Sequence, residues 1–299
     1  MGKLRELNIN LKMKQRMILV YVLGCFLPLL LVYIFMFNQI SNSLWDTQMS
    51  NQNIRLETEV GVVESAMEDA AAVSSRFYMD TESGELGFRR FSDEEDLKCG
   101  YNEFDILSEY LHSYYPVISS VSVYLDEAIV ESKDNSDGIR IDNRHYKQIT
   151  PTIMEKQWYK DATELGSIPR WSYQTNVQIG QKSPRLARIL LDQQGNRVGV
   201  ISIVLSPEIC EEYINSQDSL GLMLYKDTLI YSNFKLNEEQ LEYILSNTGE
   251  DEYTGNLTYE SDVYLTSKVN INSRYSKDYY SIILVYNSVL VIFVTNTKI

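Results

Sequence analysis

The stretch LARILLDQQGNRVGVISIVLS, from Leu186 to Ser206, decides the fold class of the chain. It holds two apolar runs, residues 186–192 and 198–206, separated by the polar, glycine-bearing turn QQGNR. Apolar runs of this length bounded by turn residues are typical of strands, and a short connection makes two strands antiparallel. The stretch therefore predicts a long antiparallel β-hairpin.

A repeated pair of shorter strands extends this pattern. The segments SVYLDEAIVES, from Ser122, and LMLYKDTLIYS, from Leu222, each hold an apolar strand, a polar turn and a second strand that ends on serine. Such strands joined by short turns are typical of hairpins. Two more strand patterns follow, VYLTSKVNI (263–271) and YYSIILVYN (279–287). We therefore expect two modules with antiparallel sheets.

Helical periodicity precedes and separates the strands. One seam of apolar or small residues follows alternating steps of four and three, the spacing of a helix that buries a narrow stripe. The seam consists of Leu56, Val60, Val63, Met67, Ala70, Ser74 and Phe77. It packs either against the chain's own domain or against a second copy near the membrane, and its weakly apolar positions favour intrachain packing for the upper part. Shorter helical patterns cover residues 102–115 and 237–247.

Residues 17–37 form an apolar segment of 21 residues without a charge. As a helix it spans roughly 31 Å, the thickness of a bilayer core. Five basic residues precede it, and residues 38–44 carry no charge. The positive-inside rule then predicts a cytoplasmic N-terminus and an exported chain from about Asn38. A cleaved signal peptide or a lipoprotein box at VLGC fits less well, because the apolar run is long and continues past Cys25.

The charge balance excludes a nucleic-acid reader. The formal net charge is −14, and removing residues 1–37 leaves 22 basic and 40 acidic residues, a charge of about −18. A protein that binds phosphates needs a basic face. The exported part is therefore expected to be soluble and to avoid anionic membrane surfaces.

Motifs for catalysis or metal binding are missing from the sequence. His112 and His145 have no metal-ligand spacing, there is no CxxC, and neither GxSxG nor HExxH occurs. Paired carboxylates such as Glu211 and Glu212 lie in runs typical of solvated surface. We expect no catalytic residues, no metal and no cofactor. Cys99 and Cys210 would form a disulfide or remain two free thiols.

The order of four motifs carries a family resemblance. LHSYYPVISSVSVYLDE is followed by QWYKDA, the tryptophan strand WSYQTN and RILLDQQGNRVGVISIVLS. Together with the basic tail, the anchor and the long helix, this order resembles the double Cache sensor domains of bacterial receptors over roughly residues 10–290. It is most similar to the extracellular halves of YesM-type sensor histidine kinases. The resemblance implies an α+β fold: a long N-terminal helix (membrane anchor plus stalk) followed by two tandem PAS-like Cache modules with antiparallel sheets.

The resemblance also implies a division of the chain. A ligand-binding module lies far from the membrane, and a module that is usually empty lies near it. The expected segments are a cytoplasmic tail (1–16), a transmembrane helix (17–37), a stalk helix (38–78), the distal module (79–206), the proximal module (207–287) and the start of a second transmembrane segment, cut short (288–299). A final strand is the alternative for the apolar C-terminal tail.

The candidate ligand-binding residues come from the same resemblance. In amino-acid-binding Cache domains an arginine two residues before the WY pair grips a carboxylate, and an acid on the next strand holds the amine. Here Lys156 takes the arginine position and the strand WSYQTN has no acid near Tyr173, so a sugar-like solute is an alternative. The candidates are Trp158, Tyr159, Trp171, Tyr173, Lys156, Arg170, Arg185 and Asp161. Core packing for the rings and surface exposure for the arginines remain open.

The expected function is sensing rather than catalysis. The resemblance implies the extracellular input region of a two-component sensor histidine kinase, and a chemotaxis receptor or, less favoured, an extracellular hydrolase are the alternatives. The expected partners are a small extracellular solute (sugar-like or amino-acid-like) or a solute-binding protein, a second copy of the chain in the membrane, and a cytoplasmic response regulator reached through further domains. Nucleic acid is not an expected partner.

Overall fold

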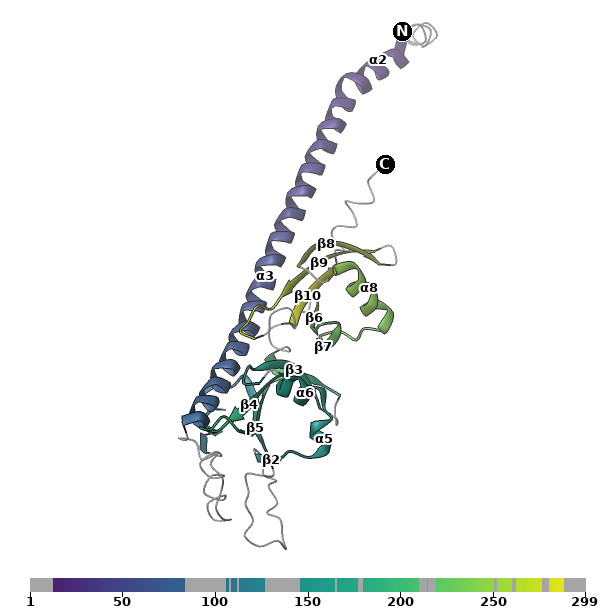
Figure 1. Cartoon of the computed structure of the whole chain (residues 1–299). Coiled ribbons are helices and arrows are strands. Elements are labelled where there is room, and N and C mark those ends of the chain that lie inside the picture. Colours follow the sequence, from purple (N-terminus) through teal and green to yellow (C-terminus); the bar gives the residue numbers. More distant parts are fainter. Residues whose placement is uncertain are drawn as a thin grey trace, which may run out of the picture. The chain divides into compact units, whose positions relative to one another are not determined.

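Figure 1 shows the computed structural model of the chain. The structure describes residues 13–83, 106–107, 109–111, 113–126, 146–164, 166–176, 180–209, 214, 219–249, 252–259, 262–275 and 280–287. Two units are compact on their own, and the second comprises residues 53–287. The predicted second strand AIVES, the segment after residue 287, Cys99 and Cys210 all lie outside the described residues.

The chain begins with a long helical segment. Helix α2 (Met13–Tyr21) continues through a π-helical turn η1 (Val22–Phe26) into α3 (Leu27–Ser83). Pro28 explains the wide turn, because a proline has no N–H to donate to the preceding turn and its ring crowds the carbonyl there. The N–H of Leu27 accordingly donates to the carbonyl of Val22, five residues back. Among the described residues, one helix is long and apolar enough to cross a membrane.

The predicted seam of α3 lies in the core. All seven of its residues are buried, and Ala66, Ala71 and Val73 widen the buried face. The seam packs against side chains of both sheets in one hydrophobic cluster. Intrachain packing of the upper helix is thus confirmed.

The first module, for which we keep the name distal module from the sequence prediction, is built on a five-stranded sheet. Its elements are β1 (Ile118–Leu125), β2 (Tyr146–Gln148), α5 (Pro151–Met154), α6 (Gln157–Glu164), β3 (Arg170–Thr175), β4 (Lys182–Leu191) and β5 (Arg197–Leu205). The strand order is β2-β1-β5-β4-β3, and all pairings except β1–β2 are antiparallel. The hairpin predicted from residues 186–206 is confirmed as β4–β5.

Alternation divides this sheet into two faces. Leu186 and Leu190 of β4 join the core cluster that contains the buried face of α3. Ala187 and Ile189 of the same strand join a separate cluster with Trp158 and other residues of α6. Figure 1 shows α6 near β3 and β4. We call the second surface the α6 face.

The second module, for which we keep the name proximal module from the sequence prediction, also has a five-stranded sheet. It contains β6 (Ser219–Tyr225), β7 (Thr228–Ser232), α8 (Glu238–Thr248), β8 (Tyr253–Tyr259), β9 (Asp262–Asn270) and β10 (Tyr280–Asn287). The sheet order is β7-β6-β10-β9-β8, and every pairing is antiparallel. Asn237 starts α8 with a capping box that it shares with Gln240. The α+β fold with two antiparallel modules is confirmed.

Two local features refine the prediction. Strand β8, which the sequence analysis did not predict, lies at the edge of its sheet, and Leu257 is its buried residue. In the predicted segment VGVISIVLS, Gly199 serves close strand packing, because a Cβ there would overlap the backbone carbonyl oxygen of Tyr124 on β1. Only glycine allows the two backbones this approach.

Candidate ligand-binding site

Helix α6 presents two aromatic side chains to the distal sheet. Trp158, Tyr159 and Ala162 are its buried residues, one short stripe of an amphipathic helix. The exposed Gln157 donates from Nε2 to Oδ1 of the half-buried Asp161 at 2.7 Å. Lys156, just before the helix, is exposed. Lys156 therefore lies away from the buried stripe that carries Trp158, whereas the half-buried Asp161 borders it.

Trp158 joins the helix to an arginine of the sheet. Its ring lies 5.2 Å from that of Tyr124 on β1, centroid to centroid. The Cζ atom of Arg185, on β4, lies 4.5 Å from the indole centroid. The indole Nε1 is buried and has no hydrogen-bond partner. Trp158 and Arg185 are thus two predicted site residues that the structure brings together.

Arg185 is a buried cation. The residue is 6% exposed, its Nη2 donates to Gln174 Oε1, and its Nε has no hydrogen-bond partner. Burial lowers the pKa of the guanidinium, and the neighbouring Tyr124 and Tyr280 partly oppose this. Ser172 is the cross-strand partner of Arg185, and its Oγ is also buried without a partner. The α6 face therefore holds three buried polar atoms without hydrogen-bond partners: Trp158 Nε1, Arg185 Nε and Ser172 Oγ.

Tyr159 occupies a different place under the same helix. Burial raises the pKa of its phenol, the positive charge of Arg197 lowers it, and the negative charge of Asp126 raises it. Its hydroxyl has no hydrogen-bond partner. Arg197 itself forms a two-pronged ion pair with Asp126, at 2.8 and 3.1 Å. Tyr159 thus lies near the Arg197–Asp126 pair, and its ring centroid also lies 5.9 Å from that of Trp158.

Trp171 and Tyr173 share a face of β3, as alternation predicts, but it is the face opposite to α6. Trp171 is 1% exposed and stacks edge-on against Tyr280 of β10, with centroids 6.2 Å apart. Tyr173 stacks in the same way against Tyr225 of β6, at 5.6 Å. The structure does not bring these two rings together with Trp158 and Arg185. Arg170, the first residue of β3, lies on the α6 face by alternation.

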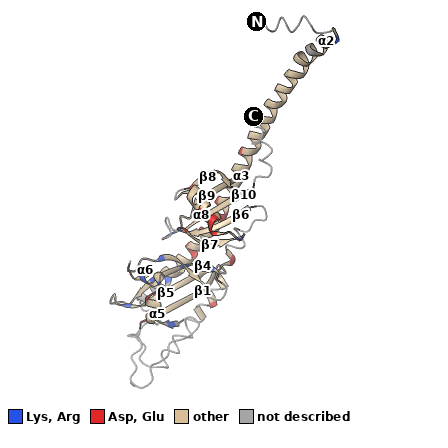
Figure 2. Cartoon of the chain, turned by 90° about the vertical axis from the view of Figure 1, so that its right-hand side faces the viewer, with Lys and Arg blue, Asp and Glu red and all other residues tan. Residues whose placement is uncertain are grey.

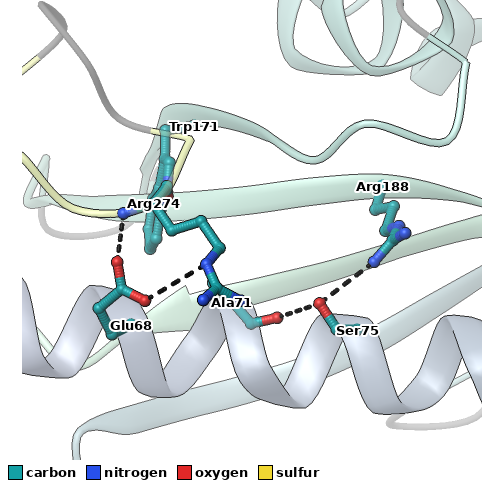
Figure 3. A network of polar contacts seen from close by, with 6 residues as sticks. All are labelled: Glu68, Ala71, Ser75, Trp171, Arg188 and Arg274. Atoms are coloured by element: carbon teal, nitrogen blue, oxygen red, sulfur yellow. Dashed lines mark hydrogen bonds and ion pairs between the residues drawn. The ribbon is translucent and has the colours of Figure 1, made fainter.

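The back of β3 is tied to the proximal module and to α3. Trp171 Nε1 donates to the backbone oxygen of Arg274 at 3.2 Å, and Tyr280 Oη donates to the backbone oxygen of Ser172. The backbone N–H and the side chain of Arg274 both contact the carboxylate of Glu68 on α3 (Figure 3). One strand therefore contributes Ser172 to the α6 face and Trp171 to this junction.

The sequence analysis missed Ser172, Gln174 and Tyr124. The sequence does contain a pattern that could have identified Ser172 and Gln174. Alternation from Arg170 puts residues 170, 172 and 174 on one face of a strand, and a hairpin register between β3 and β4 puts Arg185 opposite Ser172. Among the described residues, no group of three His, Cys, Asp or Glu side chains is placed to hold a metal ion.

Comparison with known proteins finds solved structures that share the fold of this chain at low sequence identity. No family model matches the chain, and no curated protein matches it. The ligand-binding domain of the Campylobacter jejuni chemoreceptor Tlp3 in complex with L-valine is similar, with a TM-score of 0.53 and 12% identity over 83% of this chain and 96% of that one. The ligand-binding domain of Mlp24 with asparagine has a TM-score of 0.54 and 14% identity over 87% and 98%.

A third structure agrees with these two. The ligand-binding domain of the Pseudomonas fluorescens chemoreceptor CtaA in complex with L-serine has a TM-score of 0.53 and 11% identity, and the match covers 81% of this chain and 98% of that one. The fold of the chain is therefore the double Cache fold of such sensor domains. All three similar structures are ligand-binding domains, and those of Tlp3 and CtaA come from chemoreceptors. In the described part of the chain, this fold follows an N-terminal helix that is long and apolar enough to cross a membrane.

Proposed function

We propose that the chain is the extracellular sensing region of a bacterial transmembrane receptor and that a small solute binds on the α6 face of the distal module. One observation carries this proposal: Trp158 Nε1, Arg185 Nε and Ser172 Oγ are buried without hydrogen-bond partners on that face. Native proteins leave few buried polar atoms unpaired, and a group of them is expected where a ligand supplies the missing partners. Residues 79–206 form the binding module in this proposal, and residues 207–287 form the module that passes the signal on.

Trp158, Arg185 and Ser172 are the proposed contacts, and Arg170 borders them. Of the other predicted residues, Trp171 and Tyr173 have a role in transmission. A solute that shifts β3 through Ser172 also shifts the backbone oxygen to which Tyr280 donates and the indole of Trp171, which donates to the backbone oxygen of Arg274. Glu68 on α3 in turn accepts from the backbone N–H of Arg274. The signal is then a change in the relative populations of two arrangements of α3.

The type of receptor is a further part of the proposal. We favour a sensor histidine kinase that acts as a membrane homodimer, has a second membrane helix and passes phosphate to a response regulator. The similar solved structures come from chemoreceptors, so a chemotaxis receptor is the second candidate. The coding sequence downstream of Ile299 decides between them, because a kinase needs a phosphoacceptor histidine and a nucleotide-binding domain.

Binding to the full chain in lipid nanodiscs tests the proposal. The midpoint of thermal unfolding is measured with a panel of sugars, amino acids, organic acids and short peptides, since a ligand that binds only the folded state raises this midpoint. We expect at least one solute to stabilise the wild-type chain and Trp158→Ala to weaken its binding by at least about tenfold, the loss of one well-placed aromatic contact.

Trp45→Ala is the matched control, because Trp45 lies on α3 in the first compact unit and is expected to leave affinity unchanged. A panel in which no solute stabilises the wild type would reject the small-solute proposal and leave a solute-binding protein as the partner to test. Equal affinity in wild type and Trp158→Ala would reject the α6 face as the site.

A further inference from the structure

The charge distribution of the distal sheet is opposite to that of the whole chain. Its five strands contain six basic residues and no acidic one, although the chain carries a net charge of −14. The basic residues are Lys147, Arg170, Lys182, Arg185, Arg188 and Arg197. The five strands of the proximal sheet hold one acid and one base, Asp262 and Lys268. Figure 2 shows the Lys and Arg positions of the distal module in blue.

Two arginines of this sheet differ in how they are paired. The side chain of Arg197 is 39% exposed, and its Nε and Nη2 atoms form a fork with the carboxylate of Asp126. Arg185 is 6% exposed, and Gln174, a neutral amide, contacts its Nη2 while its Nε has no partner. Among the described residues, no carboxylate forms an ion pair with Arg185. The more deeply buried cation therefore lacks the anion that the more exposed one has.

A buried charge without a counter-ion is unfavourable for folding, so stability alone does not account for Arg185. Its guanidinium stacks on Trp158, an arrangement that leaves the guanidinium edge open to partners in its own plane. Gln174 occupies half of the edge that Asp126 fills completely on Arg197. A planar or tetrahedral oxyanion fits such an edge with two parallel hydrogen bonds.

The other unpaired atoms require the same kind of partner. The Nε–H of Arg185 and the Nε1–H of Trp158 can only donate hydrogen bonds, and the hydroxyl of Ser172 donates as readily as it accepts. Among the described residues, the strands of the sheet offer an ammonium group no acid, and the half-buried Asp161 of α6 already accepts a hydrogen bond from Gln157. The site therefore offers donors and positive charge.

We infer that the solute is an anion that presents a carboxylate or phosphate group to the Nε–Nη2 edge of Arg185 and needs no ammonium group. This inference rests on the proposed function, because it names the ligand class of the same site. It separates the chain from a sensor for α-amino acids, which would require an acidic partner for the amine. In this inference, the bound oxyanion replaces Gln174 as the acceptor of the hydrogen bond from Arg185 Nη2.

The test uses the full chain in nanodiscs and pairs each anion with a neutral analogue at equal ionic strength. Succinate is compared with succinamide, benzoate with benzamide, and glycerol phosphate with glycerol, and inorganic phosphate, sugars and amino acids complete the panel. We expect at least one anion to raise the unfolding midpoint and its neutral analogue to leave it unchanged. Stabilisation by succinate or benzoate would identify the ligand as a carboxylate, and stabilisation by glycerol phosphate or inorganic phosphate would identify it as a phosphate.

Variants of Arg185 then assign the contact. Arg185→Met should abolish the effect of the anion, and Arg185→Lys should weaken binding at least about tenfold, since lysine keeps the charge but loses the fork. Arg188→Lys is the matched control, because Arg188 lies on the same strand but contacts Ser75 and Tyr78 of α3. Without ligand, Arg185→Met should melt no lower than wild type, because it removes an unpaired buried charge.

The outcomes separate this inference from the proposed function. If only sugars or amino acids stabilise the chain, the anion inference is wrong and solute sensing stands. A large drop in the ligand-free midpoint of Arg185→Met would show that Arg185 supports the fold and would also overturn the inference. If no solute of any class binds, both proposals fail.

Discussion

The indole Nε1 of Trp171 donates a hydrogen bond to the backbone oxygen of Arg274, at 3.2 Å and across 103 residues of sequence. This bond joins β3 of the distal module to the segment between β9 and β10 of the proximal module. The ring of Trp171 also stacks on Tyr280, whose hydroxyl donates to the backbone oxygen of Ser172. Trp171 is therefore a structural link between the modules in the unit formed by residues 53–287.

The first prediction concerns the stability of this link. Trp171→Ala should lower the free energy of unfolding by about 3–5 kcal/mol, the usual cost of emptying a large aromatic core position. Trp171→Phe keeps a ring but loses the hydrogen bond, and we expect a smaller loss, about 1–2 kcal/mol. Denaturant unfolding measures both. A nearly unchanged stability of Trp171→Ala would indicate that the ring lines a ligand pocket instead.

The second prediction uses one substitution at two glycines. Gly199→Ala should destabilise the fold by about 1–3 kcal/mol, because the new Cβ overlaps the carbonyl oxygen of Tyr124 on the neighbouring strand. Gly61→Ala should instead stabilise it by about 0.5–1 kcal/mol, because Gly61 lies inside α3 and a Cβ there meets no atom within 4 Å. Thermal unfolding of the two variants should therefore give shifts of opposite sign. A shared sign would contradict the strand packing or the helix assignment.

Much of this architecture is predictable from sequence, because it depends on local patterns. The seam from Leu56 to Phe77 and the hairpin from Leu186 to Ser206 follow from periodicity that each segment carries in itself. The direction of Trp171 does not follow in this way. Alternation shows that Trp171 and Tyr173 share a face, but which face meets α6 depends on contacts with residues more than 50 positions away, such as Tyr225 and Tyr280.

The burial of Arg185 escaped prediction for a related reason. A single arginine in an apolar strand is usually a surface charge, and its environment depends on a helix about 20 residues away that covers one face of the sheet. Arg185 is buried under Trp158 of α6, whereas the side chain of Arg197, on the same hairpin, is 39% exposed. Sequence patterns therefore predict the strands and the helix more readily than they predict which side chains of the sheet are buried under the helix.

The third prediction concerns pH. Glu59 on α3 is buried, and its Oε2 has no hydrogen-bond partner. Burial raises the pKa of its carboxyl above the ordinary value of 4.5, although the hydrogen bond and the charge of Arg55 lower it. Between about pH 4.5 and the raised pKa, the folded state therefore binds more protons than the unfolded state, and the contribution of Glu59 to stability falls as the pH rises through the raised pKa.

Glu59→Gln removes this charge and keeps an acceptor for Arg55. We expect the variant to be more stable than wild type at pH 7 and the difference to vanish below about pH 4.5, where Glu59 is protonated in both states. Thermal unfolding between pH 4 and pH 8 measures the difference. Glu57→Gln, at an exposed position of the same helix, is the control. A Glu59→Gln variant that is less stable than wild type at pH 7 would show that the ion pair with Arg55 outweighs burial.

The last prediction concerns how α3 holds the segment between β9 and β10. The carboxylate of Glu64 accepts a hydrogen bond from the backbone N–H of Asn272 at 2.7 Å, and that of Glu68 accepts one from the backbone N–H of Arg274. Glu68→Ala should speed hydrogen exchange of the Arg274 amide by at least about tenfold, because the amide loses its acceptor. The amide of Asn272, held by Glu64, should be much less affected.

Glu68→Gln separates the hydrogen bond from the charge. Its side-chain oxygen still accepts from the Arg274 amide, so protection should largely remain, while the ion pair with the Arg274 side chain is lost. That ion pair is 3.8 Å long and joins side chains that are 61% and 44% exposed, so its loss should cost well under about 1 kcal/mol. Unchanged exchange of the Arg274 amide in Glu68→Ala would mean that other contacts, such as those of Trp171 and Glu64, hold this segment without Glu68. The proposed route from β3 to α3 through Glu68 would then have to be abandoned.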